Sequence, residues 1–298
     1  MKRARHPHPM ASNRRRWVAA LACAGLVPAL LRAQPSPAAA PPAQGVAPLR
    51  LGLTPFLSPR SLLVSYEPLR LHLQARLGRA VVFYSARDFR ALLQHARQPE
   101  QPFTMMPVHL ALMLVEDAGF KLLARSTLQS PLALWTLPDR LQELSAPGAL
   151  AGRRVAIADP LTLAALRLER WRAEQGLEAS MAMLQHPNLG AAVLSLRRGE
   201  VDVVLAPEAA LRELPGTTGA DLQLLVDLGA IPSPCWIAGP GAKAADSAAF
   251  LTALLSFQGA GDRSSAARFV QAVPADLARW QPFANIARER LRKPPPLR

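Results

Sequence analysis

The feature that most constrains the fold is an alternation of short apolar segments with amphipathic segments, which runs from Leu49 to about residue 273. Val201–Ala206 is apolar except for Asp202, and such a run is typical of a strand buried on both faces of a parallel sheet. Apolar residues at helical spacing precede it over 189–196. The pattern occurs in two blocks, 49–134 and 139–231, and therefore predicts an α/β protein with two lobes and parallel sheets.

Local signals predict where several elements begin and end. Ser65 is expected to cap a helix that holds Pro68 in its first turn. Asp159-Pro160 is expected to start another helix, with Asp159 as its cap. Apolar spacing predicts a helix over Ser264–Val273, and Arg288–Arg298 is expected to be a basic, proline-containing tail.

Residues 1–33 have the pattern of an export signal peptide. A basic start, Met1–Arg16, precedes the apolar run Trp17–Leu31, and Ala33 is the expected cleavage point. The apolar run is shorter than the roughly 20 residues of a membrane-spanning helix. Arg14–Val18 resembles a twin-arginine signal, and an ordinary secretory signal is an equal alternative. A lipoprotein attached at Cys23 is the weaker alternative, so we expect a periplasmic protein.

A proline- and alanine-rich linker is expected over residues 34–48, because it holds too little apolar side chain to fold. The formal net charge is +14, and residues 1–33 contain seven Lys or Arg and no acid, so about +7 remains after them. This charge is compatible with an anionic small ligand. Basic residues are not clustered among aromatic ones, so we expect no nucleic-acid partner. Cys235 would be the single cysteine after cleavage, which excludes an internal disulfide.

The sequence lacks the motifs of common enzymes. It contains no Gly-x-Ser-x-Gly, no His-Glu-x-x-His and no phosphate-binding loop that ends in Gly-Lys-Ser/Thr. The four histidines beyond the expected signal have no metal-ligand spacing. We therefore expect no catalytic activity, no cofactor and no metal site.

Four stretches in a fixed order resemble the phosphate/phosphite/phosphonate-type periplasmic substrate-binding proteins of ABC transporters. They are Leu49–Pro55, Tyr66–Gly78, Leu150–Pro160 and His186–Asp202. The resemblance covers most of the chain from 49 to about 240. It implies the type II periplasmic-binding-protein fold, with two α/β lobes, a ligand cleft between them and two hinge crossings.

The resemblance divides the chain into a first lobe, 49–134 plus 236–298, and a second lobe, 139–231. The crossings would lie near Leu134–Asp139 and Ile231–Trp236. In the family, the stretch after the Asp-Pro pair is rich in Ser, Thr and Gly, whose hydroxyl and N–H groups hold the anion. Here Thr162 is the only hydroxyl that remains in this stretch.

Six residues are candidates for contact with the ligand. From the second lobe, His186 stands where the family places a cleft histidine, and Thr162 lies at a helix start. From the first lobe the candidates follow strand ends: Thr54, Ser58, Tyr84 and Met106. The structural alternatives are an ordinary loop for Thr54 and Ser58, a surface loop for His186, local capping for Thr162, and core packing for Tyr84 and Met106. A methionine suits an organic ligand better than a phosphate.

Together these features predict an exported solute-binding protein of an ABC importer. It would be a monomer that captures a phosphonate-like oxyanion or a small organic ligand by lobe closure, and its partners would be a membrane permease and its ATPase. The alternative is a ligand-sensing or scaffold protein with a degenerate cleft, partnered with a membrane receptor. An enzyme on the same scaffold is the weakest hypothesis.

Overall fold

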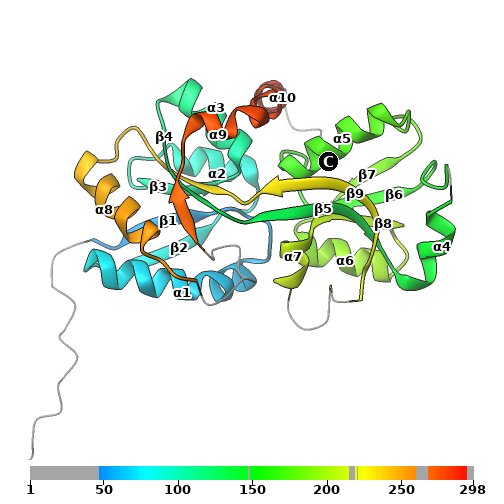
Figure 1. Cartoon of the computed structure of the whole chain (residues 1–298), viewed down its shortest axis with the longest axis horizontal. Coiled ribbons are helices and arrows are strands. Elements are labelled where there is room, and N and C mark those ends of the chain that lie inside the picture. Colours follow the sequence, from blue (N-terminus) through cyan, green and yellow to red (C-terminus); the bar gives the residue numbers. More distant parts are fainter. Residues whose placement is uncertain (1–46, 147, 215–218, 220, 260–267, 294–298) are drawn as a thin grey trace, which may run out of the picture. The chain divides into compact units, whose positions relative to one another are not determined.

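The computed structural model describes residues 47–146, 148–214, 219, 221–259 and 268–293, which all belong to one compact unit, Pro42–Arg298. The expected signal peptide, and all of the expected linker except Ala47 and Pro48, lie outside the described residues. Two sheets form the framework of the described unit (Figure 1). None of the helices within the described ranges combines the length and apolar character that crossing a bilayer requires.

The first sheet has six strands. In spatial order they are β11 (Phe269–Gln271), β4 (Lys121–Ser126), β10 (Cys235–Ala238), β3 (Phe103–Met106), β1 (Leu49–Leu53) and β2 (Val81–Ser85). The strands β3, β1 and β2 are parallel, whereas β10, β4 and β11 pair in antiparallel fashion. The sheet is therefore mixed, not parallel as expected, because β10 returns from the second sheet and enters between β3 and β4 in the opposite direction.

The second sheet has five strands. In spatial order they are β7 (Ala182–Gln185), β6 (Arg154–Ile157), β8 (Val203–Pro207), β5 (Gln129–Thr136) and β9 (Gln223–Pro232). The strands β7, β6 and β8 are parallel, and β5 is antiparallel to both of its neighbours. The chain crosses between the sheets at 127–128 and again at 233–234. The first crossing precedes the expected Leu134–Asp139, because β5 already pairs with β9 from Gln129.

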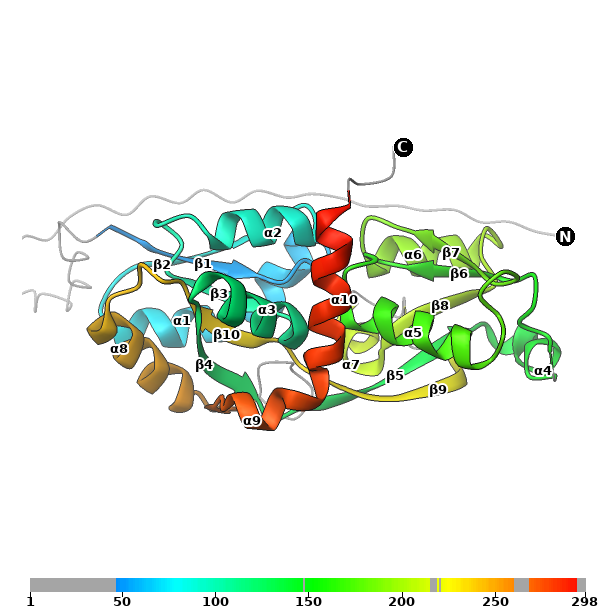
Figure 2. The same cartoon turned by 90° about the horizontal axis from the view of Figure 1, so that it is seen from above.

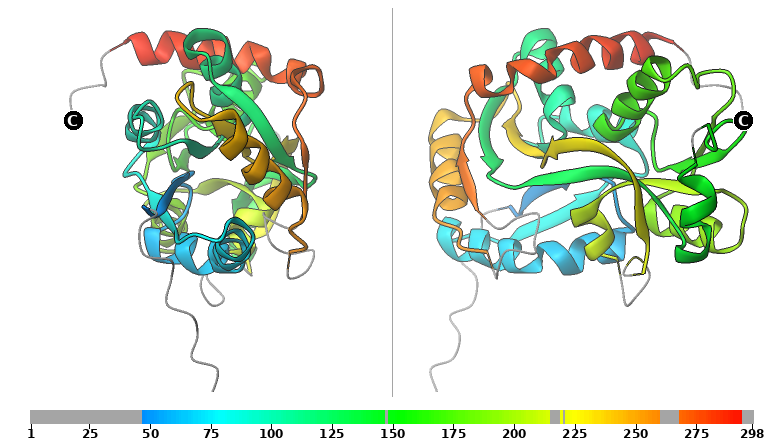
Figure 3. Two further views of the ribbon diagram at one scale, coloured as in Figure 1. Left: turned by 90° about the vertical axis from the view of Figure 1, so that its left-hand side faces the viewer. Right: turned by 45° about the vertical axis from the view of Figure 1, so that its right-hand side comes forward.

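Helices cover both faces of the sheets. They are α1 (Pro59–Leu77), α2 (Phe89–Ala96), α3 (Val108–Ala118), α4 (Leu141–Leu144), α5 (Leu163–Glu174), α6 (Leu189–Arg197), α7 (Glu208–Arg212), α8 (Ala244–Leu255), α9 (Pro274–Leu277) and α10 (Gln281–Arg292). In the first sheet, α1 (light blue) and α10 (red) lie on opposite sides (Figure 3). Neighbouring strand residues therefore enter different cores: Met105 packs into the cluster that contains α1, and Met106 into the cluster that contains α10.

The first helix begins earlier than the sequence suggested. Ser58, not Ser65, is its cap, and the Ser58 hydroxyl accepts a hydrogen bond from Ser61 N–H at 3.2 Å. Pro59 occupies the first turn, where its missing N–H costs nothing. The extra turn buries Leu62 completely. Pro68 consequently lies inside the helix, not in its first turn.

The C-terminal region also differs from the expectation. Residues 264–267 of the expected helix lie outside the described part, and 269–271 form β11, which pairs with the outer edge of β4. Backbone pairing at this open edge overrides the helical spacing of the apolar residues. The expected basic tail is helical through Arg292, because Phe283, Ala284 and Ala287 are buried on one face of α10.

Candidate functional site

A cavity of about 140 Å³ lies between the two sheets. Its lining residues follow the carboxyl ends of β1 and β6 and the end of β8, which is where open α/β sheets bind ligands. Phe56, Phe89 and Val108 form the wall on the side of the first sheet. Leu163 and Leu205 lie on the opposite side. The wall is therefore contributed by both sheets and is mainly apolar.

The polar groups of the cavity are mostly hydroxyls. Thr54, Ser130, Thr162 and Ser233 supply them, and Glu213 is the only ionisable side chain among the lining residues. The N-termini of α3 and α5 also reach the cavity, since Val108 and Leu163 begin these helices. Helix N-termini carry partial positive charge and unpaired N–H groups. The site therefore combines an apolar wall, hydroxyl oxygens, two helix N-termini and one carboxylate.

Asp159 links the two sides of the cavity. One carboxylate oxygen accepts a hydrogen bond from Phe89 N–H at 3.2 Å, and the other accepts one from Leu161 N–H at 2.7 Å. Burial raises the pKa of Asp159, while these two N–H donors oppose the rise. Asp159 is therefore not the helix cap that the sequence suggested. Thr162 caps α5 and accepts a hydrogen bond from Ala165 N–H at 3.1 Å.

His109 forms a second link beside the cavity. The imidazole lies in the first turn of α3, is fully buried, and its Nε2 lies 2.8 Å from the Leu161 carbonyl oxygen. Because a carbonyl only accepts, Nε2 carries the proton and donates. Burial lowers the pKa of His109 to about 4, so the ring is neutral at pH 7. A neutral histidine between the sheets therefore acts as a structural hydrogen-bond donor.

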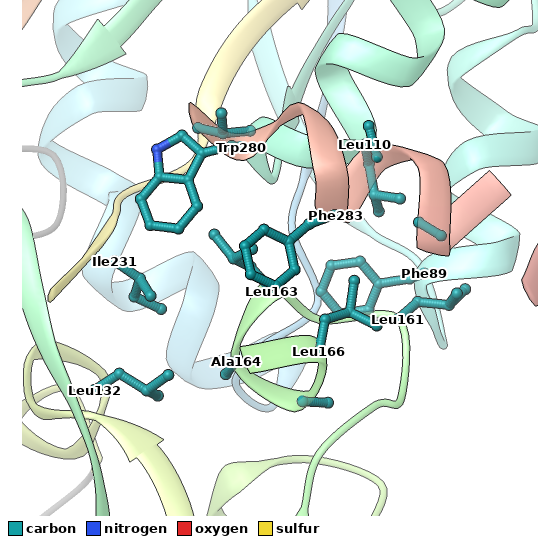
Figure 4. Packing of buried hydrophobic residues seen from close by; sticks show 14 of the residues in the cluster. Phe89, Leu110, Leu132, Leu161, Leu163, Ala164, Leu166, Ile231, Trp280 and Phe283 are labelled. Atoms are coloured by element: carbon teal, nitrogen blue, oxygen red, sulfur yellow. The ribbon is translucent and has the colours of Figure 1, made fainter. Parts of the chain in front are cut away.

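Helix α10 runs along the boundary between the sheets and contacts both α3 and α5 (Figure 2). Trp280 and Phe283, just before and within α10, pack near Leu163 (Figure 4). Arg290 donates to the Pro160 carbonyl at 2.7 Å and forms an ion pair with Glu169 of α5. We call the part around each sheet one half of the described unit. Together with Asp159 and His109, α10 joins these two halves on this side of the cavity.

Comparison with known proteins identifies the family. A family model described as the periplasmic substrate-binding protein of the phosphonate ABC transporter matches residues 51–286. The chain belongs to this family of phosphonate-type solute-binding proteins. The match extends over both sheets and ends within α10. A search of curated proteins found no match.

Solved structures share the fold at low sequence identity. A binding-protein component of an ABC phosphonate transporter from Pseudomonas aeruginosa is 14% identical with a TM-score of 0.69, over 81% of this chain and 86% of that chain. PhnD1 from Prochlorococcus marinus, solved in complex with methylphosphonate, is 11% identical with a TM-score of 0.67, over 81% and 98% of the two chains. A Xanthomonas citri protein bound to chloride ion is 16% identical with a TM-score of 0.61, over 82% and 99%.

The structure brings two of the six candidate residues to the cavity. Thr54 and Thr162 line it, from opposite sides. The Thr54 hydroxyl donates to the Met105 carbonyl at 2.9 Å, and the Thr162 hydroxyl donates to the Asp159 carbonyl at 2.8 Å. Both side chains are therefore fixed by hydrogen bonds to the backbone. Their contact with a ligand stays a prediction.

The other four candidates lie outside the lining of the cavity. Ser58 caps α1, and Met106 is fully buried in β3. Tyr84 is half-buried beneath the guanidinium of Arg50, which lies 5.8 Å from its ring centroid, and burial raises the pKa of its phenol. His186 is partly exposed, with Nδ1 3.1 Å from the Leu184 carbonyl oxygen. Contact of these four residues with a ligand also stays a prediction.

Sequence reasoning missed several lining residues, including Phe56, Phe89, Ser130 and Glu213. Phe56 follows Thr54 after β1, so its position at a strand end could have indicated it. Ser130 lies near the start of β5, and Glu213 follows the short helix α7; no local signal in the sequence marks either position. Within the described residues, no group of three or more His, Cys, Asp or Glu is placed to hold a metal ion.

Proposed function

We propose that this solute-binding protein is exported and captures a small solute in the cavity between its two halves, for delivery to an ABC permease and its ATPase. The observation that carries the proposal is the cavity itself, because residues from both sheets line it. A ligand that contacts both sides stabilises the closed arrangement relative to an open one. The family is a binding component of transporters, which agrees with a role in capture and delivery and not in catalysis.

The export signal over residues 1–33, with cleavage after Ala33, remains part of this proposal, as does a monomeric protein. The sequence-based division between the lobes, drawn at residue 134, would move to the crossing at 127–128 if the lobes follow the two sheets. The second crossing, at 233–234, would serve as the other hinge segment.

Native mass spectrometry of protein purified from the periplasm of its source tests this function. We expect a co-purified small molecule, and compaction by small-angle scattering when that molecule is added back to emptied protein. Protein that is empty, and that shows no thermal shift with phosphonates, phosphate or organic acids, would contradict capture of a solute.

A sensing or scaffold protein is the second candidate function. The observation that favours it is that no Lys, Arg or His lines the cavity, so a phosphonate would find no cationic side chain there. Deletion of the chromosomal gene distinguishes the two functions. Loss of uptake of the co-purified molecule indicates transport, whereas normal uptake with an altered transcriptional response indicates sensing.

A further inference from the structure

Formal charge is divided unevenly between the two halves. The ranges 47–128 and 233–293, which belong to the first half, hold 18 Lys or Arg and 9 Asp or Glu, a formal charge of +9. The range 129–232, which belongs to the second half, holds 9 Lys or Arg and 12 Asp or Glu, a formal charge of −3. A basic half joined to an acidic half indicates that one end of the protein meets an anionic partner.

The two halves also differ in how their cations are paired. Within the described part of the second half, seven arginines form ion pairs with carboxylates: Arg140, Arg153, Arg154, Arg170, Arg197, Arg198 and Arg212. In the first half, six cations have no described carboxylate within 4 Å of their charged groups: Arg50, Arg76, Arg79, Arg97, Lys121 and Lys243. Five of these six are exposed, and Arg79 is half-buried. Their charge is therefore available to a partner.

The topology of the first sheet gathers these cations at one edge, which we call the outer edge. The strands β1, β2 and β4 run in the same direction, so their starts lie together. Arg50 and Lys121 stand at the starts of β1 and β4, and Arg79 comes shortly before β2. The helices α1 and α2 return toward this edge, and Arg76 and Arg97 lie where they end. In Figure 1 the outer edge is on the left, far from the second sheet.

A groove at the outer edge brings cations from separate elements together. Arg50, Arg79 and Lys243 line it. Lys243 reaches this edge because it follows β10, which runs opposite to β3, and it precedes α8. Two exposed acids, Glu100 and Asp246, line the same groove. Together with the cations outside the groove, the outer edge therefore keeps an excess of positive charge.

The bonds that these cations make leave their charge in place. Arg79 donates to the Ala47 carbonyl at 2.7 Å, and the Arg50 guanidinium lies 5.8 Å from the Tyr84 ring centroid. The acids at the end of α3, Glu116 and Asp117, are already paired with Arg288 of α10. The outer edge also faces away from the cavity, which lies at the carboxyl end of β1. A partner bound at the outer edge would therefore leave the cavity free.

We propose that the outer edge binds the surface of a bilayer that contains anionic phospholipids. Each Lys or Arg near such a surface strengthens binding about fivefold, and the attraction acts only within about one Debye length. Exposed cations at one edge satisfy this requirement, because they approach a flat surface together. The proposed delivery of a solute to a permease takes place beside such a surface. The inference does not depend on which solute the cavity holds.

Co-sedimentation of the purified protein with lipid vesicles tests the proposal. One set of vesicles contains phosphatidylcholine with about 30% phosphatidylglycerol, and the other contains phosphatidylcholine alone. In about 0.1 M NaCl we expect at least tenfold tighter binding to the anionic vesicles, and loss of that binding in about 0.5 M NaCl. Equal binding to both sets, or binding to neither, overturns the inference. Release from the vesicles by inorganic phosphate, but not by chloride at the same ionic strength, would indicate a site for small anions and also overturns it.

Paired substitutions locate the binding surface. Lys121→Gln combined with Lys243→Gln removes two exposed cations of the outer edge and should weaken binding to anionic vesicles about 20-fold. Lys121→Arg combined with Lys243→Arg keeps both charges and should bind as the unsubstituted protein does. Arg170→Gln combined with Arg198→Gln is the matched control, because it removes the same charge from exposed positions of the second half, and its effect should be less than about twofold. An equal loss in this control, or unchanged binding after the two lysine-to-glutamine changes, overturns the inference.

Discussion

His109 should make the stability of this protein depend on pH between about 4 and 6.5. Burial lowers its pKa from 6.5 to about 4 in the folded protein. One unit of pKa corresponds to ~1.4 kcal/mol, so protonation of His109 costs about 3 kcal/mol more in the folded state than in the unfolded chain. Between pH 6.5 and 4 the unfolded chain binds the proton and the folded protein does not. The free energy of unfolding therefore decreases as pH falls through this range.

Urea denaturation at pH 7.5 and pH 5.0 measures this effect. About 2 kcal/mol of the total should already be lost at pH 5.0. In His109→Gln the side-chain amide can still donate to the Leu161 carbonyl but does not titrate. The decrease between the two pH values should therefore be about 2 kcal/mol smaller in His109→Gln than in the unsubstituted protein. His186→Gln, at a partly exposed imidazole outside the lining of the cavity, is the control. Equal decreases in His109→Gln and the unsubstituted protein would refute the reasoning.

Three further predictions concern packing and reactivity. In Gly52→Ala, the new Cβ would lie 2.7 Å from the Tyr84 hydroxyl oxygen. The free energy of unfolding, measured by urea denaturation, should therefore fall by about 1–3 kcal/mol. Adding Tyr84→Phe removes that oxygen and should recover part of the loss. Phe283→Ala should lower the free energy of unfolding by about 3–5 kcal/mol, because the ring is buried between α10 and its neighbours; a loss below 1 kcal/mol would contradict this packing. Burial raises the pKa of the Cys235 thiol to about 12, so in a Cys23→Ser background Ellman's reagent should react only after unfolding.

The sequence was informative wherever a local signal and burial agree. The largely apolar run Val201–Ala206 contains most of β8, as predicted. The predicted cores of the two blocks likewise contain parallel strands, such as β1 with β2 and β6 with β7. The sequence predicts Ser65 as the cap of the first helix, whereas Ser58 caps it. The difference arises because the buried face of α1 begins at Leu62, which the sequence does not mark. The edge strand β11 was missed because its pairing partner, β4, lies far away in sequence. Such long-range pairing leaves no local signal.

The candidate site was less predictable than the fold. Thr54 and Thr162 follow from the rule that ligands bind near strand ends, and both line the cavity. The direction in which their hydroxyl protons point depends on the carbonyls of Met105 and Asp159, which the sequence does not reveal. Asp159 looked like a helix cap because Asp-Pro favours one. Its carboxylate instead bonds to Phe89 N–H, which only the packing of the two halves could show.

The links between the halves indicate where a solute enters. Asp159, His109 and Arg290 all join the halves on the side of α3, α5 and α10. Breaking a buried hydrogen bond costs about 1–3 kcal/mol, so opening on this side would require the loss of several such bonds together. Among the lining residues, Phe56 precedes α1, Leu189 begins α6 and Ala210 lies within α7. These three helices lie on the opposite side of the sheets from α10 (Figure 1). We therefore expect opening by rotation about the crossings at 127–128 and 233–234, with α10 kept in contact with both halves and the solute entering between α1 and α6.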